Sequence, residues 1–396
     1  MSDLKSYFTD VGAKYLSKVD VGKQHEIGSN NFTSVLGDPG HSKIPFNTVS
    51  IYYGDQDEPV RASGVMTWYD TRLCQDGRRP EFRLYYKKST VSELMRAGDF
   101  CIIALRPDKS LLIVFARANS TAEQQLRWLF DIGGLPDKGF SLQQIDLQRT
   151  VNITEASILE ELGIEPRLDD ERWLDTITGS FGESFPSTAR FSEFSRKTCP
   201  NQFSPVNEPD GAIIAWLEHE EMLFRTLERR IVQKQLDAGF DTVDHFIKFS
   251  LGVQNRRKSR VGLALEHHLS EVFKANSLPF SRQAITENRA TVDFMFPSEI
   301  CYHDADFPVG RLVMLASKST CKDRWRQVLA EGAKIKSKHL FTLEPAISTN
   351  QTDEMNSHML KLVVPKKIFS TYNTAQQSRL LDLSGFIEFV RRIVKR

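Results

Sequence analysis

The sequence predicts two domains of different fold class, a mostly-β domain followed by an α/β domain. Short apolar runs separated by Gly, Asp and Pro turns fill the first 148 residues, which is typical of a mostly-β domain. Beyond residue 184, long stretches carry apolar residues at helical spacing, and two short apolar strands then flank one more amphipathic stretch. The second half is therefore expected to be α/β.

The overall composition narrows the possible classes of protein without identifying one. The chain has 396 residues, enough for two domains with cores of their own, and its 52 basic and 51 acidic residues leave a net charge of +1. Any basic surface would have to be local. Five scattered cysteines without a C-x-x-C pair argue against a disulfide framework and a structural zinc site. Together with the absence of a long apolar run and of a signal-peptide core, they predict a cytoplasmic protein without a membrane span.

In the first domain, residues 1–148, a basic stretch is the most informative feature. Arg79, Glu81 and Arg83 alternate within GRRPEFR. An arginine fork can read the edge of a guanine, and a glutamate can accept a hydrogen bond from cytosine. The alternative is a solvated hairpin tip. A short helix is expected over 122–129, after a Ser120/Thr121 cap.

Residues 149–183 are acidic and irregular in pattern, so we expect a linker with at most a helical turn at 158–162. The second domain, 184–396, begins with helices, and His219 is expected on the surface of one of them. A basic run is predicted to open a later helix, where free N–H groups and positive charge favour a phosphate. A solvated charge run is the alternative. The basic side chains of this run are Arg256, Arg257, Lys258 and Arg260.

A strand, a lysine, a helix and a second strand follow one another from Leu312 to Leu343. The first apolar strand ends at Lys318, and the helix that follows carries Glu331. An upstream strand, 291–296, alternates so that Asp293 points away from its apolar face. An acid, a lysine and a second acid at neighbouring strand ends are the parts of a Mg²⁺-dependent nuclease. Acids and lysines are common at strand ends, so the spacing by itself is a weak signal.

The chemistry nevertheless suits these three residue types. Carboxylates such as Asp293 and Glu331 bind Mg²⁺ through oxygen and leave room for water and phosphate. The bound metal activates a water and neutralises charge in the transition state. A lysine at the position of Lys318 stabilises the same developing charge.

At this point the sequence resembles a known family, the EcoRII-type restriction endonucleases. The segments that carry the resemblance keep their order along the C-terminal half: RRKSRVGLALEHHL (256–269), RQAIT (282–286), DFMFPS (293–298), YHDADFPV (302–309), STCKDRWRQVLAE (319–331), HLFTL (339–343) and LVVP (362–365). The resemblance implies a variant PD-(D/E)XK core in which the second acid moves from beside the lysine onto the following helix. Ser317 then occupies the usual acid position, and Val292 replaces a proline that coordinates nothing.

The resemblance also implies roles for residues around the catalytic centre. Lys322, Asp323 and Arg324 correspond to a triplet that reads paired cytosines and guanines in the major groove. Glu266 corresponds to an additional active-site acid. Tyr302 corresponds to an active-site tyrosine, although a packing role fits it equally well. The basic run at 256–260 would contact DNA.

The N-terminal domain resembles the family's effector domain, a DNA-binding pseudobarrel. Arg79, Glu81 and Arg83 match its R-x-E-x-R cluster. The stretches 16–22 and 25–28, with His25, resemble its recognition arm, although some family glycines are missing. The resemblance implies an effector-DNA site in this domain and autoinhibition of the nuclease by it.

The sequence therefore predicts a homodimeric, Mg²⁺-dependent type II (IIE-like) restriction endonuclease. Its double-stranded DNA target would contain CC and GG, as in CCWGG, with a central base that the sequence does not specify. A palindromic target implies two-fold protein symmetry. Two alternatives stay open: a sequence-specific DNA-binding regulator with an inactive nuclease core, and a structure-specific repair nuclease.

Overall fold

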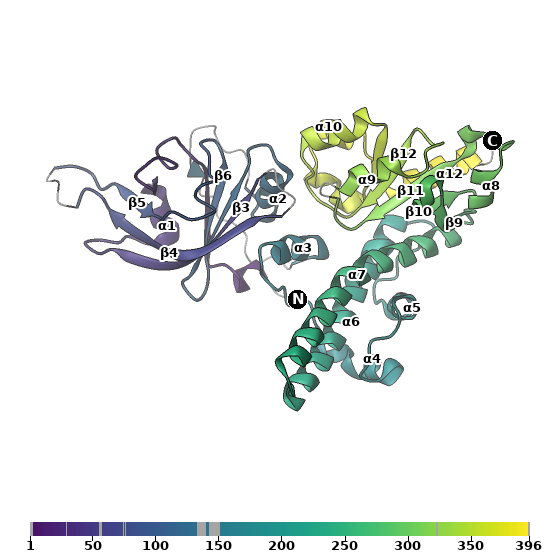
Figure 1. Ribbon diagram of the computed structural model, residues 1–396, viewed down its shortest axis with the longest axis horizontal. Coiled ribbons are helices and arrows are strands. Elements are labelled where there is room, and N and C mark those ends of the chain that lie inside the picture. Colours follow the sequence, from purple (N-terminus) through teal and green to yellow (C-terminus); the bar gives the residue numbers. More distant parts are fainter. Residues whose placement is uncertain are drawn as a thin grey trace.

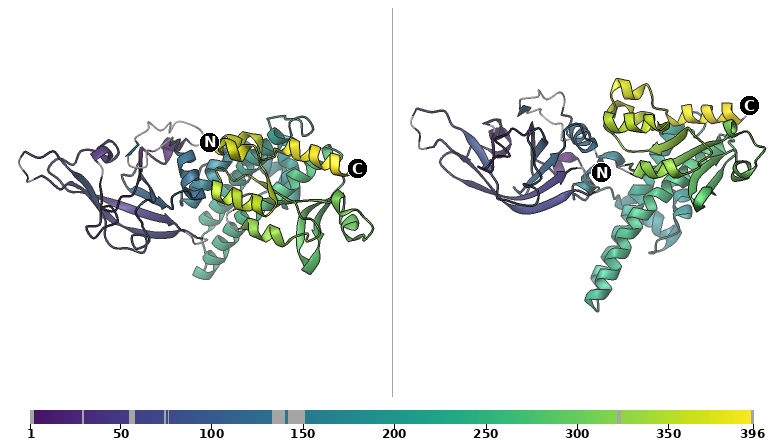
Figure 2. Two further views of the ribbon diagram at one scale, coloured as in Figure 1. Left: turned by 90° about the horizontal axis from the view of Figure 1, so that it is seen from above. Right: turned by 45° about the horizontal axis from the view of Figure 1, so that its top comes forward.

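The computed structural model describes residues 3–28, 30–54, 58–73, 75, 77–132, 140–141, 151–321 and 324–394. Lys322 and Asp323, both predicted to read DNA, lie outside the described residues. The architecture is mixed α/β, with one sheet at each end of the molecule and a long helical hairpin projecting from between them (Figure 1). The further views in Figure 2 show the same separation of the two sheets.

The N-terminal sheet is curled like half of a barrel and mostly antiparallel, with β3 and β7 as a parallel pair (Figure 1). Side chains of its central strands alternate between two cores: Ile102 packs on one face and Cys101 on the other. In spatial order its strands are β2 (Glu26–Gly28), β5 (Phe82–Tyr85), β4 (Val60–Asp70), β3 (Ile44–Tyr53), β7 (Leu111–Ala116), β6 (Phe100–Leu105), β1 (Asp10–Tyr15) and β8 (Phe140–Ser141).

Three helices accompany this sheet: α1 (Thr33–Leu36), α2 (Thr121–Leu129) and α3 (Ile153–Glu161). The helix predicted at 122–129 is confirmed as α2, and the Ser120 side chain caps it by accepting from the Glu123 N–H. The α3 helix begins with a capping box between Asn152 and Glu155, and Leu159 is buried in the same core as α2.

The segment expected to be irregular between the two domains is largely helical. Besides α3 it contains α4 (Leu174–Phe181) and a 3₁₀ turn at Glu171–Trp173. Its acidic composition concealed the apolar side of α3, because the helix buries that side against the N-terminal sheet and turns its glutamates elsewhere. The domain limits at 148 and 184 stay predictions.

The projecting hairpin consists of two long helices, α6 (Pro209–Ala238) and α7 (Val243–Ala275), with α5 (Thr188–Thr198) beside them (Figure 1). The basic run was predicted to open a helix, but α7 starts at Val243 and runs through it without a break. The basic run at 256–260 consequently lies in the middle of α7, where the backbone N–H groups are already bonded, and not at a helix start. Among the described residues, no helix is long and apolar enough to span a bilayer.

The expectation that His219 lies on a helix surface is wrong. Only 6% of His219 is exposed, its Nε2 lies 3.0 Å from Thr198 Oγ1, and its ring packs edge-on against Trp173. Burial lowers the pKa of His219 to about 4, so the ring is neutral at physiological pH. The helical pattern of α6 did not reveal this, because α6 is covered on several sides.

The C-terminal sheet mixes both strand directions. β11, β12 and β13 run parallel, while β9, β10 and β11 pair antiparallel. The strand predicted at 291–296 coincides with β10. In spatial order the strands are β13 (Leu360–Val363), β12 (Lys338–Thr342), β11 (Val313–Lys318), β10 (Thr291–Phe296) and β9 (Ser281–Ile285).

Helices pack around this sheet and enclose one large core. The C-terminal helix buries Phe386 and Val390 in that core. The helices are α8 (Glu299–His303), α9 (Trp325–Ala330), α10 (Thr349–Ser357), α11 (Thr374–Gln377) and α12 (Leu383–Val394). The remaining 3₁₀ turns are η1 (Leu4–Ser6), η2 (Asn30–Phe32), η4 (Glu287–Arg289), η5 (Val309–Arg311) and η7 (Lys366–Thr371).

The N-terminal sheet reaches the C-terminal domain through α2. Gln125 Nε2 donates to Glu344 Oε1 at 3.0 Å, and Thr121 Oγ1 lies 2.8 Å from Gln351 Oε1 on α10. The Ser348 N–H also donates to Thr121 Oγ1, at 3.0 Å. These polar contacts join two surfaces whose apolar cores remain separate.

Candidate functional site

Asp293 and Lys318 meet where β10 and β11 lie side by side. The Ser317 N–H and Oγ donate to Asp293 Oδ2 at 2.7 and 3.1 Å, and Lys318 Nζ lies 3.6 Å from the same oxygen. Asp293 is buried to 9% exposure, so these contacts replace water around a nearly enclosed carboxylate. Ser317, at the position where an acid would be usual, therefore supports the aspartate.

Glu331 lies at the C-terminal end of α9, one residue beyond the helix on which it was predicted. Its backbone is extended, with φ −80° and ψ 141°, because α9 stops at Ala330. Burial, together with the nearby Asp293 carboxylate, raises the pKa of Glu331 to about 7, while the charges of Lys318 and Lys338 act in the opposite direction. The charges of Asp293 and Lys318 thus both act on the Glu331 carboxylate.

A third acid, Glu266 on α7, is linked to Asp293 through a residue that the sequence analysis did not single out. Gln283 Nε2 donates to Glu266 Oε2 at 2.9 Å and to Asp293 Oδ1 at 3.3 Å. Arg282 Nη2 also donates to Glu266 Oε2, at 3.0 Å. The role of Gln283 follows from the register of β9 against β10, which local sequence does not specify.

Tyr302 lies beside the chain that follows Glu331. Its hydroxyl donates to both carboxylate oxygens of Glu287, at 2.7 and 2.5 Å, and its ring is buried to 1% exposure. Burial and the neighbouring Glu287 raise the pKa of Tyr302 to about 12, so the phenol keeps its proton. The structure thus brings Tyr302 close to the loop of Glu331 while enclosing the side chain.

The donor set fits a hard divalent cation. Mg²⁺ in proteins is usually held by one or two carboxylates, and waters and substrate phosphates fill the other positions. Asp293 and Glu331 supply two such carboxylates, and their mutual repulsion is relieved when a cation binds. Within the described ranges there is no group of three or more His, Cys, Asp or Glu side chains that could hold a metal by itself.

A cavity of about 660 Å³ opens in front of Lys318. Lys318, Arg324, Lys258 and Glu266 line one side of this cleft. Arg324 is exposed, and its Nη2 donates to Thr320 O at 3.1 Å and to Thr320 Oγ1 at 2.9 Å. Basic side chains from two distant segments therefore face one space together with the lysine at the strand end.

The opposite side of the cleft is formed by α3 and the residues just after it. Glu160 lines the cavity and pairs with Arg225. Glu165 accepts from Arg225 Nη1 and from Arg257 Nη1, both at 2.6 Å. Two arginines that border the cleft are thus neutralised by acids from the segment between the two sheets.

The four basic residues predicted at 256–260 have different environments. Lys258 is exposed and lines the cleft. Arg257 lines it too, but pairs with Glu165 and Glu228, and Arg256 lies over the Phe185 ring at 4.5 Å. Arg260 is not among the lining residues: it is buried at 6% exposure between Glu220 and Glu221.

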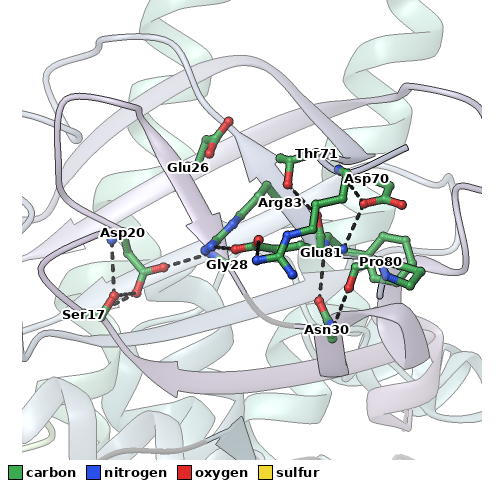
Figure 3. A network of polar contacts seen from close by, with 12 residues as sticks. Ser17, Asp20, Glu26, Gly28, Asn30, Asp70, Thr71, Pro80, Glu81 and Arg83 are labelled. Carbon is green, nitrogen blue, oxygen red and sulfur yellow. Dashed lines mark hydrogen bonds and ion pairs between the residues drawn. The ribbon is translucent and has the colours of Figure 1, made fainter. Parts of the chain in front are cut away.

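The N-terminal cluster forms a separate polar site at the edge of the curled sheet (Figure 3). Glu81 pairs with both Arg83 and Arg72, and Asn30 Nδ2 donates to Pro80 O at 3.0 Å. Together with exposed Arg79, these residues line an open cavity of about 440 Å³.

Arg83 crosses directly over Gly28 in β2 (Figure 3). A Cβ at that glycine would meet Arg83 Nη1 at 1.6 Å, so any larger residue would displace the Arg83 guanidinium. Asp20 fixes the same strand by accepting from the Gly28 N–H at 2.8 Å. His25 is half-buried and its ring lies 5.2 Å from that of Tyr86. The structure therefore brings the predicted arm and the R-x-E-x-R cluster together.

Comparisons with known proteins define the class. Residues 224–387 match the family model described as EcoRII C terminal. This part of the chain contains the strands, the acids and the lysine of the cleft, and the chain is a type II restriction endonuclease homologue. The assignment to EcoRII-type enzymes made from the sequence is thereby confirmed.

One relative is the type II restriction enzyme EcoRII of Escherichia coli, which is 44% identical over 181 residues. The match covers 46% of this chain and 45% of EcoRII, so it spans about half the length of the curated relative. Two solved structures are also similar. Metal-depleted Ecl18kI in complex with uncleaved DNA has a TM-score of 0.46 at 16% identity, over 57% of this chain and 83% of that one. A PspGI–substrate DNA complex has a TM-score of 0.44 at 12% identity, over 55% and 95%.

Proposed function

We propose that this chain is a Mg²⁺-dependent type II restriction endonuclease that makes double-strand breaks at a short site containing CC and GG, such as CCWGG. The observation that carries the proposal is the pairing of Asp293 with Lys318 on neighbouring strands of a mixed sheet, with Glu331 in a loop that Lys338 of the next strand binds. These residues lie within the part of the chain that matches the EcoRII C-terminal family. We propose that this part has the variant PD-(D/E)XK core.

In this proposal Asp293 and Glu331 hold the metal and Lys318 faces the scissile phosphate. A bound Mg²⁺ would lower the pKa of a water and neutralise charge on the phosphate. Lys318 would stabilise the charge that develops on the phosphate oxygens. Ser317 keeps Asp293 oriented through two hydrogen bonds, and Gln283 ties Glu266 to the same carboxylate. Tyr302 would be an active-site residue that is buried beside the loop that follows Glu331.

We assign base reading to Lys322, Asp323 and Arg324, a few residues beyond Lys318. Arg324 would form a bidentate contact with guanine, and Asp323 would accept from cytosine. What supports this is the position of Arg324 in the same cleft as Lys318. Lys258 and Arg257, which line the same cleft, would contact phosphates. Recognition and catalysis would then share one short segment of chain.

We also propose that the N-terminal domain binds a second, effector DNA through Arg79, Glu81, Arg83 and His25. This domain would restrain the nuclease until effector DNA is bound. Contacts of α3 and of the residues just after it support the restraint: Glu160 and Glu165 add to the counter-charge of Arg225 and Arg257, two arginines that border the cleft. DNA relieves such a restraint only if it favours the arrangement in which α3 has left the cleft.

The enzyme would act in the bacterial cytoplasm as a homodimer, because two-fold symmetry matches a palindromic or pseudopalindromic target. Sequencing the ends of DNA digested by the pure protein with Mg²⁺ tests the proposal. We expect ends at one short CC/GG-containing sequence and none when Mg²⁺ is omitted. Cleavage without sequence preference would instead indicate a structure-specific nuclease. Specific binding without cleavage would indicate a regulator.

A further inference from the structure

The loop that begins at Glu331 is held in place by side chains from three other parts of the chain, the β9–β10 turn, α8 and β12. The chain turns sharply at Gly332, which has a φ of +55°. A Cβ at that position would lie 3.1 Å from Met314 Sδ on β11, so the turn presses against the sheet and favours glycine in both conformation and space. Glu331 thus belongs to a tight loop and not to the helix before it.

On one side, three consecutive N–H groups of this loop donate to side chains near the β9–β10 turn and on α8. The Gly332 N–H lies 3.4 Å from Thr286 Oγ1, and the Ala333 N–H lies 3.1 Å from Glu287 Oε2. The next N–H, that of Lys334, lies 3.4 Å from the Tyr302 hydroxyl. Since Tyr302 itself donates to Glu287, this carboxylate binds both the Ala333 N–H and the tyrosine that accepts from the Lys334 N–H.

On the other side, Lys338 of β12 donates to two carbonyls of the loop. Its ammonium bonds Glu331 O and lies 3.3 Å from Gly332 O. Lys338 is only 6% exposed, and an ammonium that is withdrawn from water needs such acceptors. An anion and a cation, Glu287 and Lys338, therefore hold the two hydrogen-bonding sides of one short loop.

We propose that Lys338 and Glu287 are positioning residues that fix the Glu331 carboxylate for binding a divalent metal ion together with Asp293. Neither touches the metal or the scissile phosphate, and both act through the backbone of the loop at 331–334. Supporting groups of this kind commonly change metal affinity or activity about 10–100-fold when they are removed. The inference rests on the proposed function, because it takes Glu331 as a metal ligand.

The test measures metal binding directly and needs no cleavage. Mn²⁺ is titrated into the full-length protein, and free Mn²⁺ is followed by its electron paramagnetic resonance signal. The variant Asp293→Ala identifies the site by removing it. We expect Lys338→Met, which keeps the length of the side chain but loses both hydrogen bonds, to weaken the Asp293-dependent Mn²⁺ site about 10-fold or more. Lys338→Arg should recover part of the affinity.

Glu287→Gln provides the second arm, because it keeps the shape of the side chain while removing its charge and one acceptor oxygen. It should weaken Mn²⁺ in the same direction. The matched control is Lys336→Met, which removes an exposed lysine next to the loop and should leave Mn²⁺ affinity unchanged. Thermal unfolding of each variant separates a loss of metal affinity from a loss of the fold.

Unchanged Mn²⁺ affinity in folded Lys338→Met and Glu287→Gln would overturn the proposal, as would wild-type protein without an Asp293-dependent Mn²⁺ site. If Lys338→Met fails to fold, Glu287→Gln decides by itself. A wild-type protein that binds Mn²⁺ through Asp293 but cuts no DNA would contradict the proposed function and leave the role of the loop intact.

Discussion

The two charged cavities of this molecule differ in how their arginines are satisfied. In the N-terminal cavity, Arg83 and Arg72 share a glutamate from their own sheet, and the space remains open. In the cleft in front of Lys318, Arg225 and Arg257 pair with two acids of α6, Glu221 and Glu228, and also with Glu160 and Glu165 from the segment between the two sheets. The arginines of one site thus have a counter-charge from their own sheet, and those of the other have counter-charges from two different segments.

We propose that this difference leaves the N-terminal site always accessible to DNA and makes the cleft accessible only when the covering segment has moved. An arginine paired within its own strand keeps its position and presents a fixed surface. An arginine with partners on two segments would lose part of its counter-charge if one segment moved, and a phosphate would then take that place. Three sets of variants test this comparison. The first removes Lys318 or Glu331, the second removes the acids Glu160 and Glu165, and the third removes Arg324 or Arg83 from the two proposed DNA-reading surfaces.

The largest effect is expected from the cleft itself. Lys318→Ala and Glu331→Ala should each lower cleavage about 100-fold or more while specific DNA binding survives, because each removes a group placed at the reacting phosphate or its metal. Single-turnover cleavage and fluorescence anisotropy with a cognate duplex measure the two properties. Lys336→Ala, at an exposed position nearby, is the control. A variant that keeps more than about a tenth of the wild-type rate, roughly 1.4 kcal/mol of barrier, would refute the assignment.

A smaller effect, in the opposite direction, is expected from the acids of the covering segment. The double variant Glu160→Gln/Glu165→Gln should raise cleavage of a DNA with a single site about 5–150-fold, because the neutral amides remove part of the negative charge around Arg225 and Arg257, which keep only Glu221 and Glu228. Effector duplex should accelerate the variant less than it accelerates wild type. Glu171→Gln, an exposed acid farther along the same segment, should change neither rate. Equal single-site rates for the double variant and wild type would leave α3 as a packing element only.

The smallest effects should distinguish the two reading surfaces. Arg324→Ala and Arg83→Ala should each weaken one class of specific DNA site by about 1–3 kcal/mol and leave the other class unchanged. Calorimetric titration of cognate duplex into the full-length protein resolves the two classes. Lys258→Ala should instead weaken all sequences alike and flatten the salt dependence. If Arg324→Ala and Arg83→Ala weakened the same class, the division into two surfaces would fail.

Local pattern determined much of this protein in advance. The strand at 291–296, the helix capped by Ser120 and the long helix from Pro209 follow from apolar periodicity and from capping, which depend on neighbours along the chain. The spacing of Asp293, Lys318 and Glu331 was by itself a weak signal, and the resemblance to a family gave it meaning. The match to the EcoRII C-terminal family confirms that resemblance for residues 224–387, and the roles of the three residues stay predictions.

Other features depended on which segments pack together. The acidic stretch after residue 150 reads as a linker until α3 is seen buried against one sheet and bordering the cleft of the other domain. His219 and Arg260 lie on helices that look amphipathic and exposed, yet neighbouring helices cover both residues. Gln283 and Lys338 reach the site through strand pairing and through a loop at the end of a short helix. Such contacts join residues far apart in sequence, so only the tertiary structure decides them.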